Sequence, residues 1–388
     1  GMLSMVSCSD FLDKTSPSEL NTESVYNSTY YTGLRINKIY GGLSDDRTYA
    51  QDFSIVMGLN TDCELIDALD NTTVHATGNY RGVMNYNVDP GFTNLDKVWT
   101  NMYKVIEDAN LCIEGIRQSP LLNSGNKSEV NTMKRYLGEA LFLRAFYYFH
   151  MVNTWGAIPY NSEPVTAQNF NPTRMPENEV YGKVLDDLDE SIAKFEAAGY
   201  KTKADGRANY WAAKALRSRV LLYAASWLGG QLGQTVKGGN YDGKDKNALY
   251  TAAQADAEAV IGARDYASLD NDYKHVWTMA NESYNTNQEA LFGVTYSQDI
   301  KTNANCIPYR YRLEGGSPMQ YNSLITRTGY SRGGNAMLLM FVSMWNNGAN
   351  DLGGNGQKDT QVFWRIAAGK TTIKSKSTGK NVECGAAY

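Results

Sequence analysis

The stretch Arg135-Tyr-Leu-Gly-Glu-Ala-Leu-Phe-Leu-Arg-Ala-Phe-Tyr-Tyr-Phe-His-Met-Val-Asn-Thr-Trp-Gly-Ala-Ile-Pro159 decides the fold of this 388-residue chain. Most of it belongs to a predicted helix over about 130–152, whose second half is apolar nearly all round. A helix that is hydrophobic on every side has to be buried, so we expect this one at the centre of the molecule. Arg135 and Glu139 stand four positions apart and are predicted to pair on its surface.

Four further helices are predicted around this central one. Apolar residues recur at three-to-four spacing, which is typical of helices, over about 96–116, 178–198, 209–227 and 248–263. In the second of these, the opposite face is predicted to be acidic and solvated, with Asp186, Asp187, Asp189 and Glu190. Alanines in the last two would let neighbouring helices approach closely.

Sequential helices that set aromatic residues against small ones resemble tetratricopeptide stacking, although a strict 34-residue repeat is absent. The predicted fold class is therefore mainly α, a degenerate tetratricopeptide-like helical repeat frame with long irregular loops and few short strands. Such loops are usually where binding resides on a rigid helical frame.

Composition narrows the classes of function. Lys and Arg number 37 and Asp and Glu number 41, a net charge of −4, which argues against nucleic acid as a partner. No run of about 18 apolar residues predicts a membrane-spanning helix. The chain holds 27 Tyr, whose flat apolar faces and polar edges suit a surface for neutral polar ligands such as sugars.

The first 20 residues carry signals of processing. Gly1 before Met2 is interpreted as a tag scar, and the next residues, up to Ser7-Cys8, resemble the end of a bacterial lipoprotein signal peptide. In such a signal the Cys receives the lipid, so Cys8 is the predicted lipidation site. The polar, Pro-broken stretch that follows would serve as a tether, and residues 21–388 are predicted to form a single domain.

Several segments together resemble the SusD-like (RagB/SusD) outer-membrane nutrient-binding lipoproteins of Bacteroidetes. The opening Cys8-Ser-Asp-Phe-Leu-Asp-Lys-Thr15 is similar to the start of these proteins, and the stretch from Arg135 to Pro159 is very close to their central signature. Weaker similarity follows in the right order at 99–116, 207–223, 252–261 and 287–292. Beyond about residue 300 the similarity fades, so 300–388 is expected to be divergent or truncated relative to the family.

The resemblance implies a function. It predicts a surface-exposed lipoprotein of the cell outer membrane that serves polysaccharide utilization, with the lipid anchor as its only membrane contact. It would capture an oligosaccharide or polysaccharide and deliver it to a SusC-like TonB-dependent transporter. Two alternatives stay open, a helical-repeat scaffold that binds a peptide or protein, and a glycoside hydrolase.

The residues themselves favour one loop as the sugar site. Tyr80 and Tyr86 could stack on pyranose faces, while Asn79, Arg81 and Asn85 could bind hydroxyl groups. The alternative is that both tyrosines only pin the loop onto the helices. Tyr296 and Tyr309, with Arg310 and Tyr311, form a second candidate set.

No pattern predicts catalysis, a metal or a cofactor. Asp186 and Glu190 lie on one helix face and cannot flank a glycosidic bond, and no G-x-S-x-G motif occurs. The segment Asn240–Asp245 offers side-chain oxygens for Ca²⁺ but lacks the closing Glu of an EF-hand loop, and a turn is the favoured interpretation. Cys112 is expected to be a small buried hydrophobe, and the four Cys other than Cys8 leave three disulfide pairings open.

Overall fold

The computed structural model describes residues 22–45, 47–50, 52–59, 64–66, 82–83, 86–204, 206–271, 288–294 and three short strands. The chain divides into two compact units, one of residues 1–39 and 106–293, the other of residues 40–105 and 294–388. The expectation of a single domain over 21–388 stays a prediction. Cys8 lies outside the described residues.

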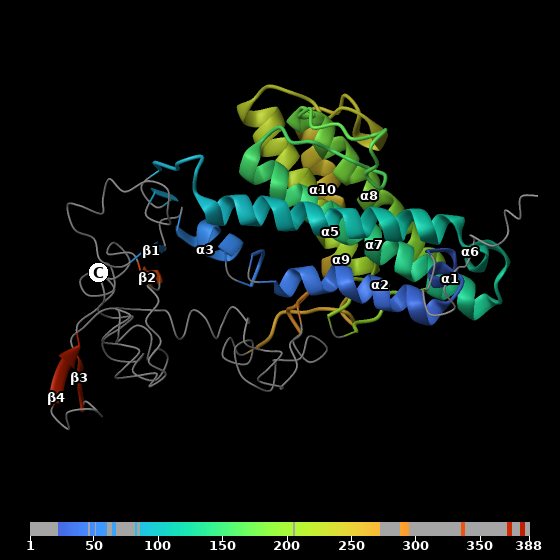
Figure 1. Cartoon of the computed structure of the whole chain (residues 1–388), viewed down its shortest axis with the longest axis horizontal. Coiled ribbons are helices and arrows are strands. Elements are labelled where there is room, and N and C mark those ends of the chain that lie inside the picture. The colour runs from blue at the N-terminus through green and yellow to red at the C-terminus, as the bar shows by residue number, and fades with distance from the viewer. Residues whose placement is uncertain are drawn as a thin grey trace, which may run out of the picture. The chain divides into compact units, whose positions relative to one another are not determined.

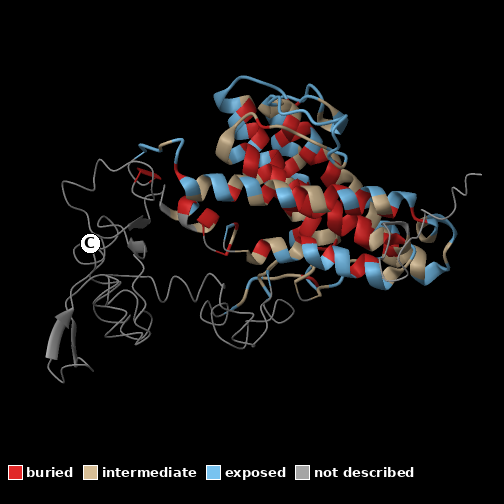
Figure 2. Cartoon of the chain, viewed as in Figure 1, coloured by how far each residue is buried: buried red, intermediate tan, exposed pale blue. Residues whose placement is uncertain are grey.

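Helix α7 (Lys127–Trp155) is the centre of the first unit. The Asn126 side chain accepts from the backbone N–H groups of Ser128 and Glu129, and Glu129 accepts from the Asn126 N–H in return, a capping box that starts the helix. From Met133 to Val152 most side chains are buried, as the apolar sequence predicts (Figure 2). Gly156 ends the helix at φ 70°, a conformation that favours glycine.

Helices α8 (Glu177–Ala197), α9 (Tyr210–Tyr223) and α10 (Lys246–Gly262) follow α7 in antiparallel succession, each packed on the one before it (Figure 1). After α9 the chain continues as the π-helical segment η3 (Ala224–Gln231). The short 3-10 turn η4 (Gly239–Tyr241) packs against α8. This order confirms the predicted fold class, a mainly helical, tetratricopeptide-like frame.

Small residues allow these helices to approach closely. The Ser191 hydroxyl of α8 donates to the Gly138 carbonyl of α7 at 2.7 Å, and a Cβ at Gly138 would lie 3.0 Å from the Phe195 ring. The Ser218 hydroxyl of α9 donates to the Ala253 carbonyl of α10 in the same way, also at 2.7 Å. Hydroxyl-to-carbonyl bonds of this kind satisfy buried polar groups where backbones come near each other.

Helices α1 (Thr22–Tyr26), α2 (Thr29–Gly41), α5 (Thr93–Gln118) and α6 (Pro120–Ser124) precede α7. Ser119 caps α6 and also donates its hydroxyl to the Tyr26 carbonyl at 2.6 Å. Cys112 is buried and free, as expected, and burial raises the pKa of its thiol to about 11. The Tyr26 hydroxyl contacts its sulfur at 3.7 Å, so α1 is anchored on α5.

The predicted pairing of Arg135 with Glu139 occurs, but its predicted place on the surface is wrong. Arg135 Nε lies 3.2 Å from a Glu139 oxygen, and the Glu139 carboxylate is fully buried. A second cation from the segment before α9, Arg207, reaches the same carboxylate at 2.7 Å. A buried carboxylate is stable only when its charge is compensated, and these two cations compensate it.

In the second unit, the described elements are η2 (Gly42–Ser44), α3 (Asp52–Leu59), the first part of α5 and two antiparallel strand pairs. The Asn94 amide donates to Asp52 at 3.0 Å and so joins α5 to α3. Strand β1 (Glu64–Ile66) pairs with β2 (Asn335–Met337), Leu65 opposite Ala336. Strand β3 (Thr371–Lys374) pairs with β4 (Asn381–Cys384).

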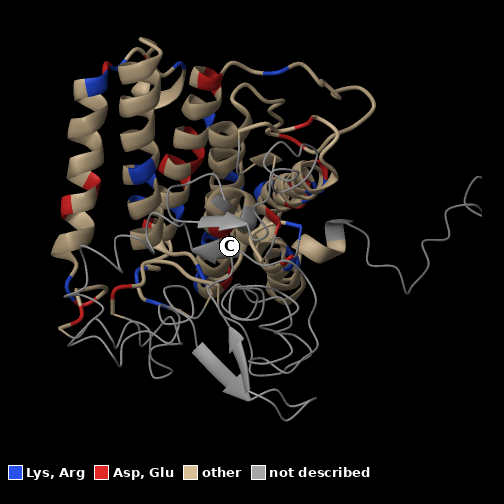
Figure 3. Ribbon diagram, turned by 90° about the vertical axis from the view of Figure 1, so that its left-hand side faces the viewer, with Lys and Arg blue, Asp and Glu red and all other residues tan. Residues whose placement is uncertain are grey.

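Acidic and basic residues lie interspersed along the described helices (Figure 3). Among these helices, none combines the length and the apolar character needed to cross a membrane.

Candidate functional site

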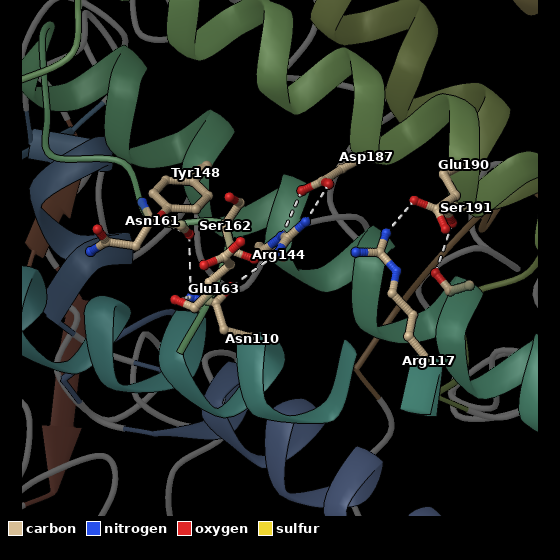
Figure 4. Close-up of polar contacts among 11 residues, drawn as sticks. Asn110, Arg117, Arg144, Tyr148, Asn161, Ser162, Glu163, Asp187, Glu190 and Ser191 are labelled. Atoms are coloured by element: carbon tan, nitrogen blue, oxygen red, sulfur yellow. Dashed lines mark hydrogen bonds and ion pairs between the residues drawn. The ribbon is translucent and has the colours of Figure 1, made fainter. Parts of the chain in front are cut away.

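A buried ion pair lies between α7 and α8. Arg144 donates from Nε to Asp187 Oδ2 at 2.8 Å and from Nη2 to Asp187 Oδ1 at 2.6 Å, so the pair is bidentate (Figure 4). Arg144 is 3% exposed and Asp187 is 5% exposed. Burial alone would lower the pKa of Arg144, but the charge and hydrogen bonds of Asp187 hold that pKa above its usual range. The guanidinium therefore stays charged inside the frame.

The same guanidinium fixes the loop that runs from α7 to α8 (residues 156–176). Arg144 Nη1 donates to the Ser162 carbonyl at 2.7 Å and to Asn110 Oδ1 at 2.9 Å (Figure 4). Asn110 Nδ2 in turn donates to the carbonyls of Asn161 and Glu163, each at 3.2 Å. Three successive loop carbonyls are thus held by side chains of two helices.

Tyr148 adds a further fixed point to this loop. Its hydroxyl donates to the Asn161 carbonyl at 3.0 Å and accepts from the Asn161 N–H at 2.9 Å. The Tyr160 ring packs on the Tyr148 ring with centroids 4.4 Å apart, and burial raises the pKa of both phenols. The start of the loop is therefore rigid, whereas Val165 and Phe170 further along it are exposed.

The prediction of a solvated acidic face on α8 is wrong for Asp187 and incomplete for its neighbours. Asp189 accepts from Arg217 at 2.6 Å, and Glu190 accepts from Arg117 at 2.5 Å (Figure 4). Burial raises the pKa of the remaining carboxyl, Asp186. Periodicity could not reveal these contacts because the arginines come from other helices.

Of the seven residues predicted to bind a ligand, the structure describes only Tyr86. Asn79, Tyr80, Arg81, Asn85, Tyr296 and Tyr309 lie outside the described residues. Their roles stay predictions.

Tyr86 projects from a tight turn. Its N–H donates to the Val83 carbonyl at 3.2 Å, and the Asn87 N–H donates to the Gly82 carbonyl at 2.8 Å. Tyr86 has φ 59°, which is unusual for a residue with a bulky side chain. The residue is 75% exposed. A residue held in a strained conformation with its ring in solvent is typical of a contact surface.

A cleft of about 670 Å³ lies where α8, α9 and α10 adjoin their loops. Its walls come from 201–203 after α8, from Trp211 in the first turn of α9, from 262–268 at the end of α10, and from Gln288. Lys201, Lys203 and Arg264 are its basic residues, and Asp265 is its acidic one. Sequence analysis missed these residues because they come from separate segments, although Lys201-Thr-Lys203 and Tyr210-Trp211 are visible as local clusters.

A second cleft, of about 600 Å³, lies beside η4 and α10. Its polar groups are largely engaged with one another, since Asn240 and Arg217 both donate to Asp189. In the neighbouring segment proposed for Ca²⁺, Asp242 accepts from the Gly238 N–H and Asp245 caps α10. This is the turn that the sequence favours. Within the part of the chain that the structure describes, no cluster of three His, Cys, Asp or Glu residues could hold a metal.

Comparison with known proteins finds a matching family model, related sequences and solved structures of similar fold. Residues 10–222 match the model of a SusD-like family described as starch-binding and associating with the outer membrane. A relative from Formosa agariphila, SusD-like protein P25, is 23% identical over 239 residues, which is 59% of this chain and 42% of the relative.

Two solved structures share the fold. A SusD homolog from Bacteroides thetaiotaomicron VPI-5482 has a TM-score of 0.65 at 19% identity, and the match covers 85% of this chain and 58% of that chain. A structure solved with a xylogluco-oligosaccharide has a TM-score of 0.56 at 16% identity, covering 89% of this chain and 61% of that one. The chain therefore spans about half the length of the proteins that it matches.

Proposed function

Because this chain belongs to the SusD-like family, which is described as starch-binding and associating with the outer membrane, we propose that it is a glycan-binding lipoprotein of the cell surface. It captures an oligosaccharide or polysaccharide and delivers it to a SusC-like TonB-dependent transporter. Capture and release require a shaped binding surface, but no covalent bond is made or broken. The proposed role is therefore that of a binding protein and not of an enzyme.

The observation that carries this proposal is the exposed ring of Tyr86 on its strained turn. A pyranose ring stacks on an aromatic face through its C–H groups, and that contact requires a ring that is free of protein neighbours. The backbone hydrogen bonds of the turn, to the Val83 and Gly82 carbonyls, fix the backbone that carries the ring. Less conformational entropy is then lost when a ligand binds. The neighbouring Asn79, Tyr80, Arg81 and Asn85 would supply the rest of the platform.

The carboxylates of α8 support a binding role over hydrolysis. Asp187, Asp189 and Glu190 are each held by an arginine. A general acid has to carry a proton near neutral pH, and an ion pair with arginine opposes that. These three carboxylates are therefore poor candidates for the general acid of a glycoside hydrolase.

The anchor is proposed at Cys8. In the native host, labelled fatty acid should enter the wild-type protein and not the Cys8→Ala variant. Label in both proteins, or in neither, would count against lipidation at this residue.

A glycan panel tests the binding function. Purified protein is titrated with maltooligosaccharides, xyloglucan oligosaccharides and laminarin, and reducing ends are measured in the same samples. We expect binding of at least one glycan with a Kd on the order of micromolar to millimolar, and no new reducing ends. Hydrolysis proportional to protein would favour the enzyme, and binding of a peptide library alone would favour the peptide scaffold.

A further inference from the structure

The cleft at the ends of α8, α9 and α10 carries charge of the opposite sign to the chain as a whole. Three basic residues, Lys201, Lys203 and Arg264, line it together with one acidic residue, Asp265. The whole chain has a net charge of −4. A local surplus of cations in an acidic protein attracts anionic ligands to that cleft.

The cleft also has an aromatic wall. The half-buried Trp211 and the buried Tyr266 have ring centroids 6.3 Å apart, and their planes are inclined by 38°. Lys203 Nζ lies 5.2 Å from the Tyr266 ring centroid. A ligand that enters would therefore meet a flat apolar face and an ammonium group side by side, a combination suited to a ring that bears a negative group.

The side of the cleft that contains Tyr266 is held in place by hydrogen bonds. The Tyr266 hydroxyl donates to the Leu291 carbonyl at 2.5 Å, and the Ser268 N–H donates to the Gln288 carbonyl at 3.1 Å. The Asp270 N–H donates to Glu289 at 2.9 Å. These bonds tie 288–291 to the segment after α10 and fix one side of the cleft.

The basic residues have different surroundings. Lys201 pairs with Glu196 at 3.0 Å and lies over the Tyr210 ring at 4.2 Å. Burial lowers the pKa of Lys203, so an anion beside it would stabilise its charged form. Arg264 is exposed at the rim and presents a guanidinium, which binds planar oxyanions through paired N–H donors.

We propose that this cleft is a second saccharide site, distinct from the Tyr86 surface, that takes a sugar bearing a carboxylate or sulfate group. Lys203 and Arg264 bind the anionic group, and Trp211 packs on the sugar ring. Hydroxyl groups reach Thr202 and Gln288, which also line the cleft. Its volume of about 670 Å³ lies within the usual range for small-ligand sites of about 300–1,000 Å³. The inference rests on the proposed function in that its ligand is a saccharide.

The test uses the full chain and three probes of similar length, namely an oligogalacturonate, a sulfated carrageenan oligosaccharide and a neutral laminari-oligosaccharide. The double variant Lys203→Met/Arg264→Met is compared with Lys127→Met/Arg174→Met, which removes the same two charges at exposed positions away from the cleft. We expect at least one anionic probe to bind wild type and to lose about tenfold or more in affinity in the cleft variant. The control variant should stay within about twofold.

Salt and a second variant complete the test. Raising NaCl from about 50 to about 500 mM should weaken the anionic probe several-fold, because exposed charges are screened. Trp211→Phe keeps an aromatic ring and all the charges of the cleft. It should therefore weaken binding of the anionic sugar, and of its neutral analogue, less than Lys203→Met/Arg264→Met weakens binding of the anionic sugar. Comparison of the two anionic probes distinguishes carboxylate from sulfate as the group recognised.

Three results would overturn the inference. One is that neither anionic probe binds, even if neutral glycans bind in a Tyr86-dependent way, which would leave the proposed function standing. Another is that anionic binding is lost in Tyr86→Ala but kept in the cleft variant. The third is that inorganic sulfate or polyglutamate competes as well as the sugars, because the site would then recognise charge and not a saccharide.

Discussion

Arg144 on α7 and Asp187 on α8 form a bidentate ion pair that is almost fully buried, with N–O distances of 2.8 and 2.6 Å. Among the described helices, the pair joins the two that share the most extensive contact, and it also orients the loop of residues 156–176. Removal of one partner leaves a buried charge without its counterion, which is far more costly than loss of an exposed pair.

We therefore expect Arg144→Met and Asp187→Leu each to lower the free energy of unfolding by about 3–5 kcal/mol. The double variant should be less destabilised than the sum of the two, since no charge is then left behind. Denaturant unfolding of the four proteins measures this coupling. Additive losses would contradict a direct interaction.

Close packing of α8 is tested at Gly182. A Cβ there would lie 2.1 Å from the backbone carbonyl oxygen of Lys237, which cannot move aside like a side chain. Gly182→Ala should cost about 1–3 kcal/mol of stability. Gly41 in α2 is a matched control, because a Cβ there meets nothing within 4 Å and its φ is −55°. Gly41→Ala should be neutral or slightly stabilising, and equal losses in both variants would argue against the packing described.

His150 predicts a pH dependence. Burial, together with the charge of Arg219, lowers the pKa of His150 in the folded protein to about 4 from 6.5. Between these two values the unfolded chain binds a proton that the folded protein does not, so stability falls as pH decreases from 6.5 towards 4. The His150→Gln variant has no titrating group at this position, so it should not show this loss of stability. The difference in unfolding free energy between the two proteins should change by about 3 kcal/mol from pH 7 to pH 4, and a constant difference would contradict a neutral imidazole in the folded protein.

The backbone of Tyr86 makes a separate prediction. A φ of 59° disfavours any residue with a Cβ, whereas glycine adopts it readily. Tyr86→Gly should therefore be more stable than Tyr86→Ala by up to about 1 kcal/mol. Thermal unfolding of the two variants decides it. If the alanine variant is the more stable, the turn does not hold this conformation in solution.

Much of the helical frame could be predicted from sequence because it depends on local patterns. The helices predicted over about 96–116, 130–152 and 178–198 correspond to α5, α7 and α8 within a few residues. The N-terminal helices α1, α2 and α3 were not predicted, since they are short or, in α2, have only a narrow buried face.

Polar contacts between distant segments were beyond local patterns. In the sequence, Asp187 is part of an acidic helix face. Its carboxylate can be buried only because Arg144, from another helix, compensates its charge. The same holds for Glu139 with Arg207, 68 residues away. The cleft residues Lys203, Trp211 and Arg264 come from three loops or helix ends, so no local pattern connects them. The left-handed backbone conformation of Tyr86 is visible only in the structure.

Calorimetric titration of the tightest neutral glycan from the panel into Tyr86→Ala tests the central claim most directly. Tyr30→Ala is the matched control, because Tyr30 is 68% exposed on α2 and lies in the other unit. By analogy with bases stacked on aromatic side chains, loss of one stacked ring costs about 1–3 kcal/mol. The account predicts that Tyr86→Ala binds at least about fivefold more weakly while its melting temperature and the affinity of Tyr30→Ala stay near wild type. Unchanged affinity in Tyr86→Ala, or equal losses in both variants, would contradict it.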